Sequence, residues 1–129
     1  MEIVKQLAIF LENQPGALFR LTEDLASRGI NIEAISVMDS VDHAVLRLIV
    51  DKPTEALHLL GEAGVLAVES ELIRMPLGNH PGHLSNLAKK LKAIGVNIEY
   101  AYGSTGGEQG NLYLRVVDTK KVLEAFKEE

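Results

Sequence analysis

The sequence of 129 residues has no cysteine and no tryptophan, and its aromatic residues are three tyrosines and three phenylalanines. Without cysteine the chain can form neither a disulfide nor a zinc site with thiolate ligands. It also has no apolar run long enough to span a bilayer and no charged-then-apolar leader. We therefore expect a cytoplasmic protein that does not associate with membranes.

The charge of the chain has no strong bias toward one partner. The net charge is −5, and the basic residues form no clustered stripe of the kind that binds a nucleic-acid backbone. Lys89, Lys90 and Lys92 lie close together, which is typical of the solvated face of a helix. Leucine, isoleucine, valine and alanine supply most of the apolar content, as in ordinary globular proteins. The composition thus indicates a folded protein that does not bind nucleic acid.

The chain contains an internal duplication. Asn-Gln-Pro-Gly at 13–16 and Gly-Ile-Asn-Ile at 29–32 return as Asn-His-Pro-Gly at 79–82 and Gly-Val-Asn-Ile at 95–98. Both motifs of the second copy lie 66 residues after their counterparts in the first. Self-similarity at a fixed period indicates a repeated structural unit.

The duplication divides the chain into two expected domains, residues 1–70 and 71–129. A domain of about 60 residues buries only about 60% of the surface that its unfolded chain exposes. Each repeat is therefore expected to pack on the other repeat or on a second subunit. We predict at least a dimer.

Apolar periodicity and turn residues predict the same order of elements in both repeats. The first repeat is expected to contain strands at 3–11, 30–38, 45–50 and 65–68, a helix at 16–28, and a helix that opens at Pro53 and ends at Gly61 and Gly64. The second repeat is expected to contain strands at 71–77, 96–102 and 112–117, a helix ending at Ile94, and a helix from Thr119. Strand, helix, strand, strand, helix, strand is the order of an α+β, ferredoxin-like sandwich.

The second repeat is predicted to be incomplete. After Lys127-Glu128-Glu129 no residues remain to form its fourth strand. Its sheet is therefore expected to have one strand fewer than the first, which leaves an edge that must be shielded or paired.

The two Asn-x-Pro-Gly loops have the chemistry of a binding site. Each ends a strand and opens a helix, so free N–H groups and the positive end of the helix dipole meet there and favour a carboxylate. Gly16 and Gly82 let a ligand approach the backbone, and asparagine amides both donate and accept hydrogen bonds. Asn31 and Asn97 are expected to lie next to these loops. An amino acid, with its carboxylate and ammonium groups, suits such a site.

A structural interpretation of the same residues remains open. Asn-x-Pro-Gly is good turn chemistry in any protein, and an asparagine that opens a strand often satisfies a local backbone group. Duplication copies a structural turn as faithfully as it copies a binding site.

Hydrophobic strand, Asn-x-Pro-Gly, amphipathic helix and Gly-[Ile/Val]-Asn-Ile together resemble the ACT domain. The resemblance covers nearly the whole chain, as a tandem pair whose second member lacks its last strand. It implies a ferredoxin-like regulatory module that binds small effectors, usually amino acids, where paired domains meet. The ligand-binding positions that it implies are Asn13, Pro15, Gly16, Asn31, Asn79, Pro81, Gly82 and Asn97.

The sequence departs from one group of ACT domains. Serine-binding members have a histidine two residues before the loop asparagine, where this chain has Leu11 and Leu77. This departure argues against serine as the ligand.

We therefore expect a free-standing, non-catalytic protein without a cofactor, which binds an amino acid and passes the binding event to a metabolic enzyme or to its own homodimeric state. The alternative is a structural or interaction subunit that docks on an amino-acid biosynthetic enzyme and binds no ligand. Catalysis is disfavoured because no serine, histidine and carboxylate residues stand out as a triad.

Three weaker candidates remain. His80 and His83 offer two imidazoles, but a metal site needs three or four converging ligands. Residues 103–110 are rich in glycine, yet they lie between two strands and lack the lysine of a phosphate-binding loop, so they predict a long hairpin tip. Tyr100 and Tyr102 either cover a ligand near the second loop or pack on the sheet. If these histidines and tyrosines narrow the second site, the two repeats should bind a ligand unequally, or only one should bind.

Overall fold

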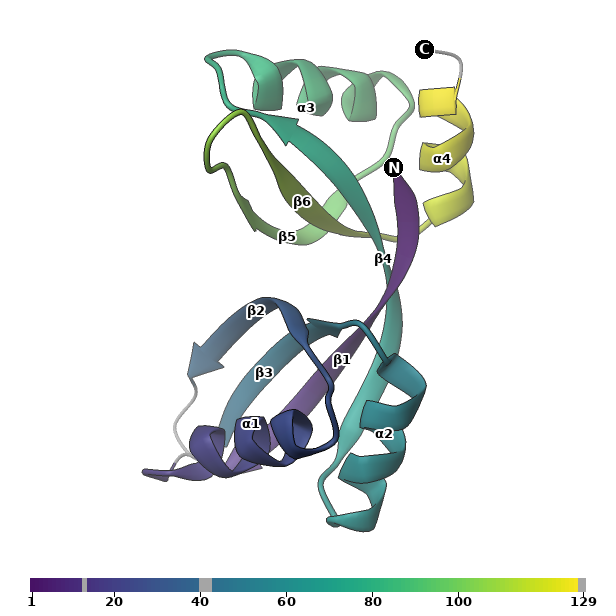
Figure 1. Ribbon diagram of the computed structural model, residues 1–129. Coiled ribbons are helices and arrows are strands. Elements are labelled where there is room, and N and C mark those ends of the chain that lie inside the picture. The colour runs from purple at the N-terminus through teal and green to yellow at the C-terminus, as the bar shows by residue number, and fades with distance from the viewer. Residues whose placement is uncertain (13, 40–42, 128–129) are drawn as a thin grey trace. The chain divides into compact units, whose positions relative to one another are not determined.

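The computed structural model describes residues 1–12, 14–39 and 43–127 (Figure 1). In chain order its elements are β1 (Glu2–Glu12), α1 (Ala17–Ser27), β2 (Ile32–Asp39), β3 (His43–Val50), α2 (Pro53–Glu62), β4 (Ala67–Gly78), α3 (His83–Ala93), β5 (Ile98–Ser104), β6 (Gln109–Val116) and α4 (Thr119–Lys127). The chain forms two compact units, the first made of Lys5–Ser70 and the second of Met1–Val4 together with the chain from Glu71 onward. The predicted order of strands and helices is confirmed, with ends displaced by a few residues, except that the strands expected at 65–68 and 71–77 form a single strand.

The first unit has the strand order β2-β3-β1-β4, with β2 at one edge. β1 pairs antiparallel with β3, from Gln6 opposite Ile49 to Glu12 opposite His43. β2 pairs antiparallel with the other side of β3. Helices α1 and α2 lie on the same face of this sheet (Figure 1). This is the ferredoxin-like sandwich that the order of elements predicts.

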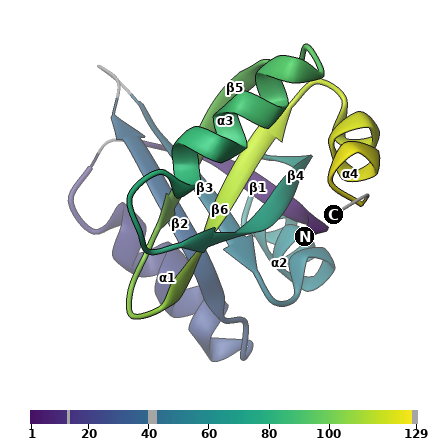
Figure 2. The ribbon, with the colours of Figure 1, turned by 90° about the horizontal axis from the view of Figure 1, so that it is seen from above.

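The second unit has the strand order β1-β4-β6-β5, with α3 and α4 as its helices (Figure 2). Its fourth strand position is filled by the start of β1. Arg74 of β4 donates from Nε to Glu2 Oε1 at 2.9 Å, and its Nη2 contacts the same oxygen. The bond to Glu2 raises the pKa of Arg74. Among the described residues no strand follows α4, so the second repeat lacks its last strand, as predicted. Because Met1–Val4, at the start of β1, takes the fourth position beside β4, the expectation that the second sheet has one strand fewer is wrong.

Two predicted strands, 65–68 and 71–77, are one continuous strand, β4. The residues between the two predicted strands contact β1. Lys5 Nζ lies 2.7 Å from Glu69 Oε1, and Gln6 Nε2 donates to Ser70 Oγ at 3.3 Å. Residues 67–75 contain no glycine or proline that would end the strand. The extended conformation therefore continues along β1.

Helix α1 begins directly after Gly16, whose φ of 87° lies in the left-handed region that favours glycine. The apolar residues of α1 follow helical spacing, so Leu21 and Leu25 are buried against the sheet. Proline and glycine mark the ends of the second helix: Pro53 opens α2 at its first turn, and Gly64, with a φ of 72°, follows its end. Gly61 lies inside α2, so its predicted role as a terminator is wrong.

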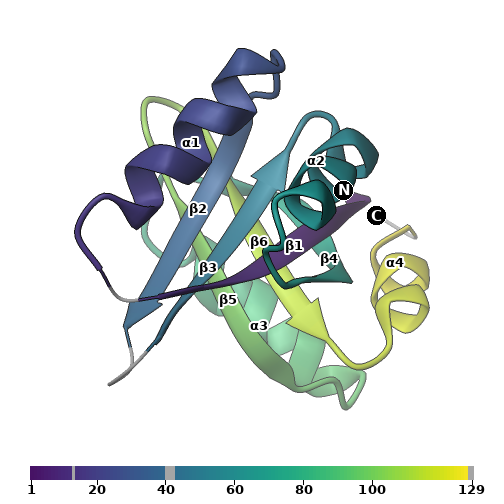
Figure 3. The ribbon, with the colours of Figure 1, turned by 90° about the horizontal axis from the view of Figure 1, so that it is seen from below.

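Each unit has its own apolar core between its sheet and its helices. Figure 3 shows α1 and α2 over the sheet of the first unit. The first core contains Leu7, Ile9, Leu21, Leu25, Ile30, Leu46, Leu48, Val50, Ala56 and Leu60. The second contains Ile73, Met75, Leu87, Leu91, Leu112, Leu114, Val116 and Val122. Because most of these residues are 66 positions apart in pairs, the duplication has kept the core as well as the loops.

Within the part of the chain that the structure describes, no helix is both long and apolar enough to cross a membrane.

Deleting Glu2–Val4 should weaken the second unit because β4 then loses its neighbour there. We expect amide hydrogen exchange to accelerate in residues 71–75, while β2 and β3 of the first unit keep their protection. Glu2→Gln is the matched control: it removes an exposed ion pair and should change stability by less than about 1 kcal/mol. Unchanged protection of residues 71–75 in the deletion variant would show that the start of β1 does not complete this sheet.

Candidate ligand-binding sites

Asn79 ties the loop between β4 and α3 to the turn between β5 and β6. Its Nδ2 donates to the Gly107 carbonyl at 2.8 Å, and its Oδ1 accepts from Thr105 Oγ1 at 3.1 Å. Its backbone N–H donates to the Glu108 carbonyl at 3.4 Å. The side chain therefore has a structural function here, and it retains one N–H and one lone pair for another partner.

A hollow of about 450 Å³ opens at the start of α3. It is lined by Leu77, Gly78, Asn79, His80, Pro81, Gly82, Leu84, Ser85 and Thr105. Gly82 precedes the helix with a φ of 89°, and no side chain caps the helix start. Free N–H groups at a helix start, together with the helix dipole, attract an anion. The second loop thus offers a carboxylate a surface that is concave and partly polar.

The two histidines of this loop lie together. His83 Nδ1 is 3.3 Å from His80 Nε2, and the ring centroids are 5.1 Å apart. Among the described residues no group of three or more histidine, cysteine, aspartate or glutamate side chains is placed to hold a metal ion. His80 lines the hollow, whereas His83 lines a second cavity on the other side of α3's first turn.

Gly16 in the first loop has the same left-handed backbone conformation as Gly82 in the second. Pro15 and Gly16 are exposed, and no side chain caps α1. Gln14 N–H donates to the Glu12 carbonyl at 2.8 Å, which tightens the turn. Asn13, the remaining predicted ligand residue of this loop, lies outside the described residues.

Asn31 and Asn97 do not lie beside the loops, and the prediction that each would is wrong. Ile32, next to Asn31, is opposite Val50 of β3, and the adjacent Ile49 is opposite Gln6 of β1, whereas the first loop follows Glu12. Six residues of strand span about 20 Å. Asn97 stands at the same distant end of the second unit, because Ile98 is opposite Val116 while Gly78 is opposite Gln109.

The physical reason is the crossover itself. A helix that connects two parallel strands returns the chain to the end of the sheet from which the first strand started. The loop at the end of β1 and the start of β2 are therefore at opposite ends of one unit. Asn31 instead pairs with Asp51: its N–H donates to Asp51 Oδ1 at 2.8 Å, and its carbonyl accepts from the Asp51 N–H at 3.1 Å.

Tyr102, near the second motif, packs on the sheet. Tyr102 is opposite Tyr113 of β6, and the rings stack with centroids 5.5 Å apart. Leu112 and Leu114, which flank Tyr113, point to the opposite face and belong to the core. Tyr100 and Tyr102 are not among the residues that line the hollow at α3. The expected hairpin between β5 and β6 is present, and its turn is confined to residues 105–108.

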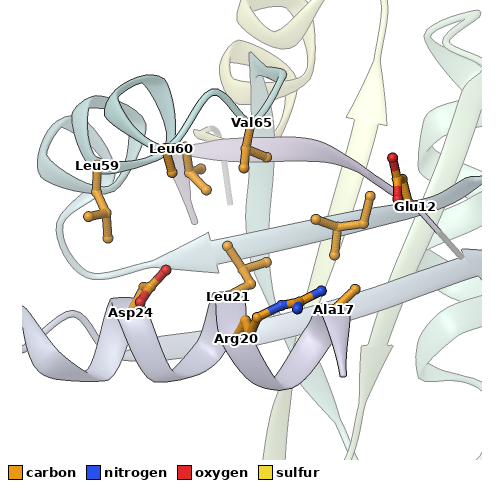
Figure 4. A pocket seen from close by; sticks show the side chains of 10 residues that line it. Glu12, Ala17, Arg20, Leu21, Asp24, Leu59, Leu60 and Val65 are labelled. Carbon is orange, nitrogen blue, oxygen red and sulfur yellow. The ribbon is translucent and has the colours of Figure 1, made fainter. Parts of the chain in front are cut away.

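Sequence reasoning missed a cavity of about 280 Å³ between α1 and α2 (Figure 4). Two charged residues of α1, Arg20 and Asp24, lie at this cavity together with the buried Leu21. The signal in the sequence is a pair of opposite charges four residues apart, on the border of an apolar helix face. Such pairs are usually surface ion pairs, so the spacing alone does not indicate a cavity.

Replacing Asn79 with alanine should destabilise the second unit, because two side-chain hydrogen bonds are lost and each contributes about 0.5–1.5 kcal/mol. Urea unfolding measures the loss, and faster hydrogen exchange at residues 105–108 would locate it. Asn97→Ala is the matched control, since that exposed side chain makes no hydrogen bond that the described residues show. Equal stability of the two variants would contradict a structural role for Asn79.

Comparisons with known proteins agree with this architecture. Among solved structures, protein BT0572 from Bacteroides thetaiotaomicron is 34% identical with a TM-score of 0.93, and the match covers 98% of this chain and 88% of that chain. The regulatory subunit of aspartate kinase from Thermus thermophilus is 18% identical with a TM-score of 0.70, covering 99% of this chain and 93% of that chain. The corresponding subunit from Thermus flavus is 19% identical with a TM-score of 0.63, covering 99% and 92%.

The two Thermus likenesses show a shared fold. A comparison with curated proteins gives no match. The family model described as an ACT domain pair matches residues 1–129. With its tandem ferredoxin-like units and its duplicated loops, the chain belongs to the ACT domain pair family.

Proposed function

We propose that this protein is a non-catalytic regulator that binds an amino acid and passes the binding event to a partner enzyme or to its own state of assembly. The observation that carries the proposal is the hollow at the uncapped start of α3, in a loop that the duplication repeats at α1. The Thermus proteins of the same fold are named regulatory subunits of aspartate kinase, which is the kind of role we propose here.

The chemistry of the hollow supports an amino-acid effector. N–H groups in the first turn of α3 would bind the carboxylate. Asn79 and Thr105 offer oxygen atoms to the ammonium group, and Leu77 and Leu84 offer apolar contact to a side chain. Such a site has few polar groups on a largely preformed surface, as small-molecule sites usually do.

We propose further that the protein is a homodimer formed through the edge strand β2. Ile35, Val37 and Met38 on this strand are 48%, 56% and 52% exposed, an unusual amount of apolar surface for an edge. An unfinished sheet in the second unit, which the sequence offered as one reason for assembly beside the small size of each repeat, no longer applies because β1 completes that sheet. The β2 edge takes its place.

Such a dimer would also bring Asn31 to a ligand-binding loop. If two β2 strands paired antiparallel, the start of one would lie against the end of the other. Asn31 of one copy would then approach the loop of Pro15 and Gly16 in its partner. The residues that are about 20 Å apart in one unit would together form a site between copies.

The alternative is an interaction subunit that docks on an amino-acid biosynthetic enzyme and has no ligand of its own. The exposed apolar residues of β2 favour this alternative as much as they favour a homodimer. Ligand binding separates the two functions.

A thermal-shift screen with the standard amino acids should find at least one that stabilises the protein, since a ligand at about 100 times its Kd adds about 2.7 kcal/mol. For the best ligand, Asn79→Ala should weaken binding by about 1–3 kcal/mol in calorimetry, because a ligand group is left unpaired. Asn111→Ala, an exposed asparagine on β6, is the control. If no amino acid shifts the unfolding temperature, the interaction subunit is the better description.

Light scattering tests the dimer. The wild-type chain should have the mass of a dimer at micromolar concentration, and Val37→Lys should shift it to a monomer because a charge would be buried at the centre of the β2 interface. Lys5→Ala, on the exposed part of β1, should leave the mass unchanged. A wild-type monomer that persists on concentration would contradict assembly through this edge.

A further inference from the structure

The cavity between α1 and α2 has apolar walls. It has a volume of about 280 Å³ and lies within the first unit, above the end of β1. Its apolar lining consists of Leu11, Ala17, Leu21, Leu59, Leu60, Ala63 and Val65. Figure 4 shows Leu21 of α1 on one side of the cavity and Leu59 and Leu60 of α2 on the other. Pockets for drug-sized ligands measure about 300–1,000 Å³, so this one fits a smaller molecule.

Three charged residues complete the lining: Glu12 at the end of β1, and Arg20 and Asp24 on α1. Arg20 and Asp24 are four residues apart, a spacing at which opposite charges on a helix commonly pair. The described structure records no such pair, nor a side-chain hydrogen bond from any of the three. In Figure 4 the two side chains leave α1 in different directions on either side of Leu21. Both charges are therefore available to a ligand at the border of the apolar cavity.

A cationic and an anionic group beside one apolar cavity match a particular class of ligand. An aliphatic α-amino acid carries a carboxylate for the guanidinium of Arg20 and an ammonium for the carboxylate of Asp24 or Glu12. Its branched side chain would contact the leucines and Val65. Burial of that side chain supplies the main driving force, and the two charged contacts set the orientation and chirality.

The duplication supplies an internal comparison. The second unit has a cavity of about 330 Å³ at the equivalent place, between α3 and α4. There Asn86 and Lys90 stand 66 residues after Arg20 and Asp24, and Lys90 Nζ lies 5.3 Å from the centre of the Phe126 ring. Gly78 occupies the position equivalent to Glu12. Among the described residues, none that lines this second cavity carries a carboxylate side chain that could bind an ammonium group as Asp24 or Glu12 would.

We propose that the α1–α2 cavity of the first unit binds a free aliphatic amino acid of the leucine, isoleucine and valine class, and that the second unit does not. This site is distinct from the loop hollow at α3, because the two share no residue and belong to different units. By joining α1 to α2, the ligand would stabilise the packing of both helices on the sheet. A chain of this kind would hold one such molecule per copy.

Calorimetry with L-leucine on the full chain tests the proposal. We expect one molecule bound per chain, and at least a tenfold loss of affinity in Arg20→Gln and in Asp24→Asn. Lys90→Gln, the equivalent change in the second unit, should leave leucine affinity within twofold of wild type. Ligand-free unfolding temperatures within about 2 °C of wild type would show that the variants are folded.

Two leucine analogues assign the charged contacts. 4-Methylpentanoate lacks the ammonium group and 3-methylbutylamine lacks the carboxylate, so each should bind at least tenfold more weakly than leucine. Arg20→Gln should have no further effect on the amine, and Asp24→Asn none on the acid. Unchanged affinities in these two combinations would show that Arg20 contacts the carboxylate and Asp24 the ammonium group.

Leucine affinity in the variants distinguishes binding at the α3 loop hollow from binding in the α1–α2 cavity. If leucine affinity falls in Asn79→Ala and survives in Arg20→Gln and Asp24→Asn, leucine binds at the loop, which supports the proposed function and overturns this inference. If the wild-type chain binds none of leucine, isoleucine and valine at millimolar concentration, the inference is also overturned, while another amino acid at the loop remains open to the thermal-shift screen.

Discussion

The antiparallel strands β1 and β4 are the constraint on which both units depend. Each strand contributes residues to both units, so neither unit is built from one repeat alone. A domain of this size buries only a small apolar core. An empty fourth position in the second sheet would also leave backbone N–H and C=O groups of β4 unpaired. Met1–Val4, at the start of β1, occupies that position. Polar contacts of Lys5, Gln6 and Arg74 link the two strands along this pairing.

A second constraint comes from the backbone at the helix starts. Gly16 and Gly82 both adopt a left-handed conformation that turns the chain sharply from strand to helix, and neither helix has a side-chain cap. The unpaired N–H groups at these points cost stability unless water or a ligand binds them. This is a physical reason for a binding function in a loop that is also a good turn.

The duplication has preserved some features and changed others. Apolar cores and left-handed glycines before α1 and α3 occur in both units, because each unit needs them to fold, and a cavity lies between the two helices of each unit. The charges around the cavities differ, with Arg20 and Asp24 in the first unit and Asn86 and Lys90 in the second. Exposed charges contribute little to folding, so they were able to diverge, and the two units consequently offer different chemistry to a ligand.

The sequence by itself determined the repeat, the order of strands and helices, and the ferredoxin-like fold, because apolar periodicity and Pro or Gly at element ends act locally. The position of Gly82 at a helix start was equally readable. Only the tertiary structure decided that Met1–Val4 completes the second sheet, that Asn31 is distant from the first loop, and that Arg20 and Asp24 border a cavity. Each of these depends on which strands and helices become neighbours, and that choice is made by long-range pairing and packing that no local pattern records.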